Sequence, residues 1–153
     1  MRAKSGFSLL ELIIAIAIIG VVAGLGFLNG RAVAERRAAQ AAIATIQQSI
    51  WQGASSAAAR GVIVELRRVA DGFTLNIDDE VLRAFEIPTE VSTNLGAGDD
   101  GVALVFTPPG KVDVASLVAL ADLGEDLYVE SPYSRYQLQI SMIGEVVATR
   151  SVP

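Results

Sequence analysis

An apolar segment near the N-terminus limits the structures that this chain can adopt more than any other feature. No charged residue occurs between Leu12 and Leu28, and the segment counted from Phe7 runs for 22 residues with Glu11 as its only ionisable side chain. A helix of this length rises about 33 Å, which matches the roughly 30 Å hydrocarbon core of a bilayer. The sequence therefore predicts one helix, residues 7–28, that crosses a membrane once.

Basic residues flank this segment on both sides. Arg2 and Lys4 precede it, whereas Arg31, Arg36 and Arg37 follow it. Positive charge favours the cytoplasmic side of a membrane. Because basic residues lie on both sides of the segment, their count alone gives only a weak preference for one orientation. We expect the N-terminus in the cytoplasm.

A cleaved secretory signal peptide is an alternative interpretation of the same residues. Ala32-Val33-Ala34 has the small-x-small pattern of a signal peptidase site, and cleavage there would release a soluble domain that begins at Glu35. The apolar run is longer than the 7 to 15 residues typical of a signal peptide, and Glu11 lies inside it. Both features favour a retained membrane anchor.

The residues Gly6-Phe7-Ser8-Leu9-Leu10-Glu11, after a short basic leader and before a long apolar helix, carry a specific resemblance. They resemble the class III signal of type IV pilins and type II secretion pseudopilins. The resemblance implies that residues 1–6 are a leader and that prepilin peptidase cleaves between Gly6 and Phe7 and methylates the new N-terminal amine of Phe7. The anchor, residues 7–28, would survive this processing.

Glu11 is the fifth residue of the mature chain in this scheme. A carboxylate at the centre of a membrane helix costs roughly 2.5 to 3.5 kcal/mol, and less near the bilayer edge. Burial in a bundle of apolar helices demands a partner for the charge. In the resembling family this glutamate and the N-terminal amine are thought to pair between or within neighbouring subunits, so Glu11 is the expected assembly residue.

The helix is predicted to continue over residues 29–61, outside the membrane. This stretch is rich in alanine, lacks proline and ends before Gly61, a typical C-terminal cap. Its apolar residues recur at steps of three and four, which predicts a stripe packed on the protein's own sheet. The stripe comprises Ala39, Ile43, Ile46, Ile50 and Ala57, and the residues that fall mostly away from it are Gln40, Gln47, Gln48, Ser55 and Arg60.

Four glycines in the apolar helix form two pairs with a spacing of four residues, Gly20 with Gly24 and Gly26 with Gly30. Small residues at this spacing let neighbouring membrane helices approach closely. The same glycines could instead mark a bend.

Residues 62–153 read as a globular, β-rich domain. Val62–Val69 and Phe73–Ile77 flank a turn and form a predicted hairpin, and a short apolar strand is expected at Val102–Phe106. Tyr136, Leu138, Ile140 and Met142 alternate with polar residues, and Ile143-Gly144 turns the chain into a last strand over 145–149. These strands predict an antiparallel meander with one buried face, while the pattern of 112–130 fits strand or helix equally.

The order of these segments extends the resemblance to the GspH/FimT branch of minor pseudopilins. The matching stretches are "AAARGVIVELRRVADGFTLNI", "FTPPGKV" and the closing pair around Met142-Ile143-Gly144-Glu145-Val146. Pro109 stands where an Asp is common, and Glu145 where an Arg is common. The resemblance implies a pilin-like α+β fold, in which the outer half of one long N-terminal helix packs on a small antiparallel sheet.

The composition argues against catalysis. The chain contains no Cys and no His, which removes disulfides, thiol chemistry and every relay that needs an imidazole. No grouping of carboxylates stands out as an acid–base pair. We expect no enzymatic activity and no cofactor.

Two further patterns are interpreted as turns. Gly96, Gly98 and Gly101 spell G-x-G-x-x-G, but a strand follows them, and Asp99-Asp100 would repel phosphates. Asp78-Asp79-Glu80 and Asp99-Asp100 lack the spacing of a calcium loop. We expect solvated loops at both places and no metal site.

The charge balance argues against nucleic acid as a partner. The net charge is −5, and loss of the leader with Arg2 and Lys4 would leave 10 basic against 17 acidic side chains, a net of −7. The only basic pairs are Arg36-Arg37, interpreted as snorkelling beside headgroups, and Arg67-Arg68, interpreted as a solvated hairpin. The last twenty residues carry Arg135 and Arg150 against Glu145, too little for strong counterion release.

These observations and the resemblance together predict a minor pseudopilin, a structural and assembly subunit of a type II secretion filament. It would sit in the inner membrane with its globular domain in the periplasm. By resemblance, its partners are prepilin peptidase, an inner-membrane assembly platform and the helices of other pseudopilins or pilins. A FimT-like minor pilin for DNA uptake or pilus assembly is the first alternative, and a secreted soluble domain is the second.

Overall fold

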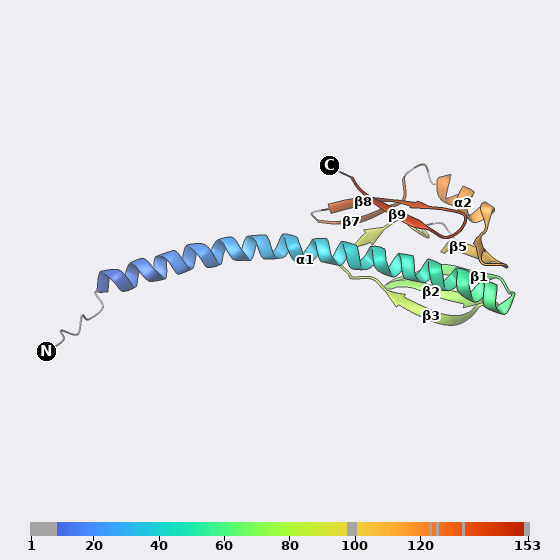
Figure 1. The fold of residues 1–153 in the computed structure, drawn as a ribbon, viewed down its shortest axis with the longest axis horizontal. Helices are drawn as coiled ribbons and strands as arrows, with labels where there is room; N and C mark the ends of the chain where they lie inside the picture. Colours follow the sequence, from blue (N-terminus) through green and yellow to red (C-terminus); the bar gives the residue numbers. More distant parts are fainter. Residues whose placement is uncertain (1–8, 98–100, 123, 125, 133, 152–153) are drawn as a thin grey trace. The chain divides into compact units, whose positions relative to one another are not determined.

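The computed structural model describes residues 9–97, 101–122, 124, 126–132 and 134–151, and among residues 25–32 it describes the backbone alone. The chain divides into two compact units, residues 1–34 and 35–153. Helix α1, Leu9–Arg60, begins in the first unit and continues into the second (Figure 1). Antiparallel sheets follow the helix, so the predicted pilin-like α+β class is confirmed.

In the second unit, one face of α1 is buried as the periodicity predicted. Ala39, Ile43, Ile46, Ile50 and Ala57 are all less than 9% exposed, whereas the five polar residues predicted to face away are all exposed. The helix ends at Gly61, which adopts φ +67° and donates its N–H to the carbonyl of Ala57 at 3.0 Å. The predicted C-terminal cap is therefore confirmed.

Five antiparallel strands form the first sheet, in the order β3-β2-β1-β5-β6. The predicted first hairpin is present, with Ala70-Asp71 as its loop and Val69 paired with Gly72. Strand β3 was not predicted, because most of its side chains are exposed and it starts directly after two aspartates. The strands are β1 Val64–Val69, β2 Gly72–Ile77, β3 Glu80–Glu86, β5 Val102–Thr107 and β6 Lys111–Val112.

Four antiparallel strands form a second sheet, in the order β4-β7-β8-β9, where the sequence had predicted a single meander. The expectation that Met142 belongs to the alternating strand was wrong. Met142 is 55% exposed and lies in the turn closed by the Gly144 N–H bond to the Ser141 carbonyl at 2.9 Å. The strands are β4 Ser92–Thr93, β7 Tyr128–Ser131, β8 Ser134–Ile140 and β9 Val146–Ser151.

The stretch 112–130, which the sequence left undecided, contains both kinds of structure. Helix α2, Val114–Ala121, lies between β6 and β7. Asp113 caps it, because its carboxylate accepts a hydrogen bond from the Ala115 N–H at 3.1 Å. An N-cap of this type is typically worth about 1 kcal/mol, which helps a helix of only eight residues to form.

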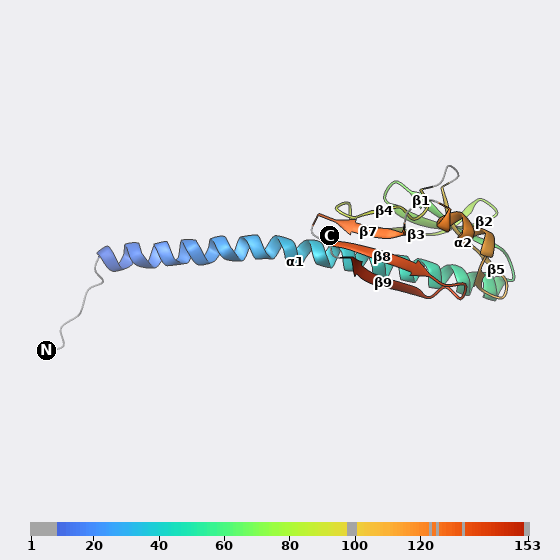
Figure 2. The ribbon, with the colours of Figure 1, turned by 90° about the horizontal axis from the view of Figure 1, so that it is seen from above.

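A single hydrophobic core joins the two sheets to the second part of α1 (Figures 1 and 2). The ring of Phe106 on β5 packs directly on the backbone of the helix at Gly53, where a Cβ atom would lie 2.3 Å from the ring atom Cε2. The sheets are also linked at their edges, since the Val112 N–H donates to the Met142 carbonyl at 3.0 Å. Helix and sheets therefore form one body in this unit.

Candidate functional site

The predicted processing and assembly site lies at the start of the chain. Gly6 and Phe7, the expected cleavage pair, fall outside the described residues. Glu11 is exposed and lies in the first turn of α1. The partial positive charge at a helix N-terminus favours a carboxylate there. Glu11 is thus compatible with the helix and free to meet a partner from outside it.

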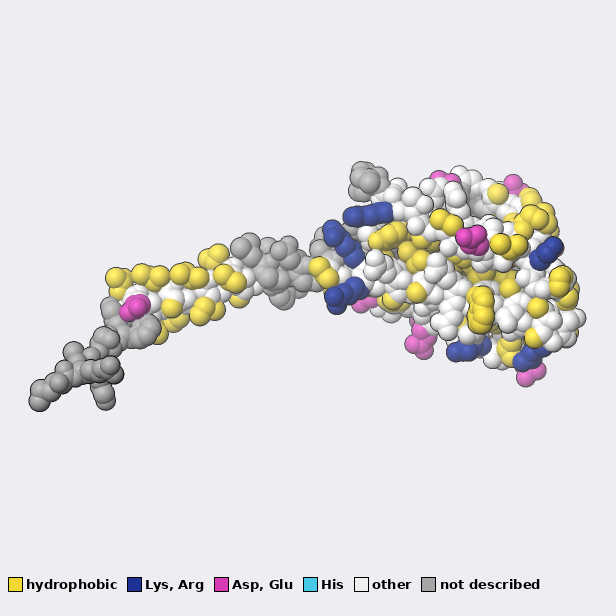
Figure 3. Space-filling model, in the orientation of Figure 1, with side chains coloured by type: hydrophobic (Ala, Val, Ile, Leu, Met, Phe, Trp, Pro, Cys, Tyr) yellow, Lys and Arg dark blue, Asp and Glu magenta, His cyan; other side chains and the backbone are white. Residues whose placement is uncertain are grey.

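Apolar side chains cover the helix surface around and after Glu11, as the yellow atoms at this end of Figure 3 show. Each is between 51% and 76% exposed. A helix that is apolar all round normally has lipid or protein against every side. The residues concerned are Leu9, Leu10, Leu12, Ile13, Ile14, Ile16, Ile18, Ile19, Val21 and Val22.

Across the part of the chain that the structure describes, no helical segment reaches the length and apolarity that a membrane crossing requires. The predicted span, 7–28, includes two residues outside the described ones and four, 25–28, whose side chains are not described.

Two glycines in the first unit, Gly20 and Gly24, have no close neighbour among the described side chains. A Cβ atom added at Gly20 or at Gly24 would meet no atom within 4 Å. Glycine in a helix interior costs about 1 kcal/mol relative to alanine. The surface at this pair is therefore open among the described residues, and close approach of another helix there stays a prediction. Gly26 and Gly30 lie in the stretch whose side chains are not described.

The comparisons with known proteins bear on this same end of the chain. Residues 1–27 match the family model of the prokaryotic N-terminal methylation motif. The match includes Gly6, Phe7 and Glu11. The chain thus carries the prepilin-type motif of type IV pilin-like proteins and pseudopilins, which implies processing by prepilin peptidase, a methylated N-terminus, assembly with other pilins and a membrane-anchored N-terminus. No curated protein and no solved structure matched the chain.

The glycine-rich segment after β4 is a turn in its described part. The Ala97 N–H donates to the Asn94 carbonyl at 3.1 Å, and both Gly96 and Gly101 adopt positive φ. Strand β5 follows at Val102, so this segment does not lead into a helix. The turn is confirmed for these residues, but Gly96 is buried and not solvated as predicted, and residues 98–100 lie outside the described part.

Asp78 and Asp79 form the tight turn between β2 and β3. Their φ angles are +47° and +67°, values that favour short polar side chains such as Asp. Both are exposed, and Asp79 lies 3.6 Å from the guanidinium of Arg67. Within the described residues, no three acidic side chains gather in a way that could hold a metal ion.

The interpretation of Arg67-Arg68 as a solvated hairpin was wrong. Arg67 pairs with Glu65 on its own strand at 2.7 Å. Arg68 reaches across to the segment that carries β4, where its Nη1 donates to the carbonyls of Thr93 and Leu95, the latter at 3.1 Å. Arg68 therefore holds the first sheet to the start of the second.

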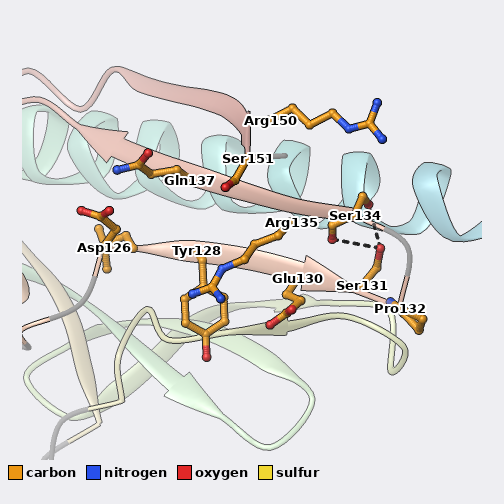
Figure 4. Close-up of a pocket in the computed structure, with 11 residues that line it drawn as sticks. Asp126, Tyr128, Glu130, Ser131, Pro132, Ser134, Arg135, Gln137, Arg150 and Ser151 are labelled. Carbon is orange, nitrogen blue, oxygen red and sulfur yellow. Dashed lines mark hydrogen bonds between the residues drawn. The ribbon is translucent and has the colours of Figure 1, made fainter. Parts of the chain in front are cut away.

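The second sheet carries a groove with a volume of about 450 Å³ at one end of its strands (Figure 4). The Arg135 guanidinium lies 4.4 Å from the centroid of the Tyr128 ring. Beside it, the hydroxyls of Ser131 and Ser134 lie 2.8 Å apart. The lining includes two arginines, Arg135 and Arg150, and two acids, Asp126 and Glu130.

This groove was not found from the sequence, because its residues come from β7, β8 and β9, and β7 lies in the stretch left undecided. Its charges of opposite sign give no preference for an anion or a cation. It offers hydrogen-bonding groups and one aromatic ring, which is the chemistry of a polar contact surface.

Proposed function

We propose that this protein is a minor pseudopilin of the GspH type, a structural and assembly subunit of a type II secretion filament. One observation carries the proposal: the N-terminal methylation motif at residues 1–27 leads into a helix whose apolar side chains are exposed on all sides. Such a helix is built to be covered by lipid first and by other helices later. The protein would lie in the inner membrane, with residues 35–153 in the periplasm.

Processing would prepare the subunit for assembly. Prepilin peptidase would cut between Gly6 and Phe7 on the cytoplasmic face and methylate the amine of Phe7. Because the cut precedes the apolar segment, the anchor would remain attached. The inner-membrane platform would then draw the subunit into a bundle with the helices of other pseudopilins. No catalysis or cofactor is part of this role.

Glu11 would act as the docking charge in this step. When apolar helices bundle, its exposed carboxylate becomes buried and requires a positive partner. The amine that cleavage exposes at Phe7 provides one in each subunit. This pairing would select one register between neighbouring helices, because a helix shifted along its axis would leave both charges unpaired.

Intact mass tests the processing step. In cells with active prepilin peptidase, the mature chain should begin at Phe7 and carry one methyl group. The Gly6→Leu variant should keep its leader, because a bulky side chain blocks the cleavage site, whereas Ser5→Ala should be processed normally. A mature chain that begins at Glu35 would contradict the proposal and support a secreted domain.

Cross-linking to other pseudopilins tests the role of Glu11. We expect Glu11→Val to insert and to be cleaved, yet to lose its cross-links, while Glu11→Asp retains part of them. Leu12→Val is the matched control, since it changes a neighbouring side chain without removing a charge. Normal assembly of Glu11→Val would show that the carboxylate is not the docking element.

The proposed role also predicts no specific DNA binding. Without its leader the chain has a net charge of −7, which repels the phosphate backbone. A gel-shift titration of the processed chain in detergent at two salt concentrations should show nonspecific binding at most. Sub-micromolar binding with a steep salt dependence, lost on Arg135→Gln, would favour a DNA-uptake pilin instead.

A further inference from the structure

Three arginines lie at the same end of the second unit. Arg36 and Arg37 are exposed on α1, and Arg150 is exposed near the end of β9. Gln47 fixes the start of β9 beside α1, because its Nε2 donates to the Val146 carbonyl at 3.2 Å. Figures 1 and 2 show β9 running along α1 from there toward the earlier residues of the helix.

The lengths of β9 and of this part of α1 place Arg150 at the same position along the helix axis as Arg36 and Arg37. From Val146 to Arg150 a strand advances about 13 Å. From Gln47 back to Arg37 a helix covers about 15 Å. Arg150 therefore ends beside the turn of α1 that carries Arg36 and Arg37. Figure 3 shows Lys and Arg side chains gathered at this end of the unit.

The register places Arg150 on the helix side of the second sheet. Arg150 pairs with Tyr136 and alternates with Ser151, so it shares a face with Ala148 and the buried Val146. Arg135 pairs with Ser151 and belongs to the opposite face, where it stacks on Tyr128. Arg150 lies at the end of β9, where it also borders the groove described above, and from the helix side of the sheet it adds its charge to that of the helix arginines.

Within the described residues, none of these three arginines forms an ion pair. The acid beside them in sequence, Glu35, has one carboxylate oxygen, Oε2, buried without a hydrogen-bond partner. These four residues together carry three positive charges and one negative charge, on a chain whose net charge is −5. Guanidinium groups match phosphate oxygens in geometry as well as in charge.

We propose that Arg36, Arg37 and Arg150 form a docking surface for the phosphate groups of anionic phospholipids. The membrane is the favoured partner because Arg36 follows Leu28, the last residue of the apolar segment, by only eight positions in the sequence. Docking would hold the globular unit against the bilayer before assembly and would weaken with salt. This inference rests on the membrane anchoring in the proposed function.

Energy transfer to labelled lipids tests the proposal on the full chain. The chain has no cysteine, so a single Ser151→Cys change next to Arg150 accepts one donor dye. The protein is placed in nanodiscs of phosphatidylcholine, alone or mixed with phosphatidylglycerol, that carry an acceptor dye on the headgroups. We expect stronger transfer in the mixture, and a loss of it when salt is raised.

Each arginine changed to glutamine should lower the ratio of docked to undocked protein about fivefold, and the triple variant about a hundredfold. Lys111→Gln is the matched control, since it removes one exposed positive charge from β6, away from these residues. Equal transfer in both lipids, an unaffected triple variant or an equal loss in Lys111→Gln would overturn the proposal.

Two further outcomes keep this test separate from the proposed function. A chain that fails to enter nanodiscs would contradict the anchoring, and the same label would then report docking on phosphatidylglycerol vesicles added in solution. Duplex DNA that binds the protein in phosphatidylcholine nanodiscs, and is released by the triple variant, would assign the surface to nucleic acid and overturn the lipid assignment.

Discussion

The two parts of helix α1 use apolar residues in opposite ways. Before Val22, large apolar side chains occur on every side of the helix and are all exposed. From Ala39 onward, most large apolar side chains occur on one stripe and are buried against the sheets, and Trp51 is the exception at 67% exposed. Both parts are helical, so the difference lies in the pattern of residues. An apolar stripe can be buried against other residues of its own chain, whereas a helix that is apolar all round requires lipid or other proteins to cover it.

Glycines show the same contrast. Gly53 lies in the second part, where the ring of Phe106 occupies the space of a side chain. Gly24 lies in the first part, and no atom of the described residues lies within 4 Å of its Cβ position. The packing of the described residues explains Gly53, whereas it gives no reason for a glycine at position 24.

The largest expected effect comes from replacing one isoleucine in each of the two parts of α1. Ile46→Ala should lower the free energy of unfolding of the second unit by about 2–5 kcal/mol, because Ile46 is fully buried in the core. Ile16→Ala should leave it unchanged, since Ile16 is 62% exposed. Urea unfolding of the full chain in detergent, followed by near-UV circular dichroism, measures both. Equal losses would show that the first part of the helix also supports the core.

A smaller effect is expected at the glycines. Gly53→Ala should destabilise by about 1–3 kcal/mol, although alanine is the better helix former, because the new methyl group would overlap the Phe106 ring. Gly24→Ala should not destabilise the same unit. The unfolding assay described above applies. If Gly53→Ala were stabilising, Phe106 would have room to move and the close contact would not matter.

The smallest effect concerns two adjacent glutamines that are both exposed. Gln47→Ala should cost about 0.5–1.5 kcal/mol, because it removes the hydrogen bond to the Val146 carbonyl. Gln48→Ala removes no hydrogen bond of the described structure and should change the unfolding free energy by less than about 0.5 kcal/mol. Similar values for both would mean that β9 is held beside the helix by its apolar contacts alone.

Features set by nearby residues were predictable from the sequence. The buried stripe of α1 and the cap at Gly61 follow from a repeat of 3.6 residues and from one glycine. The first hairpin follows from two short apolar runs around a turn. The N-terminal motif was the most specific of all, because the Gly6-Phe7 pair, Glu11 and the apolar length had to coincide.

Features set by distant residues were not predictable. Strand β3 exposes most of its side chains, and β4 has only two residues, so neither has a pattern of its own. The partners of Arg68 lie 25 and 27 residues further along the chain. The basic end joins Arg36 and Arg37 to Arg150, from opposite ends of the sequence. Pairings of this kind exist only in the folded structure.

The hydrogen bond between Gln47 and Val146 spans 99 residues and has a consequence for biosynthesis. The core of the second unit includes Val146, so it cannot close until the ribosome has delivered β9. The N-terminal motif emerges first and is available to the translocation machinery throughout that interval. Insertion of the N-terminus can therefore be complete while the rest of the chain is still a nascent polypeptide, and the membrane would be the surface beside which the globular unit folds.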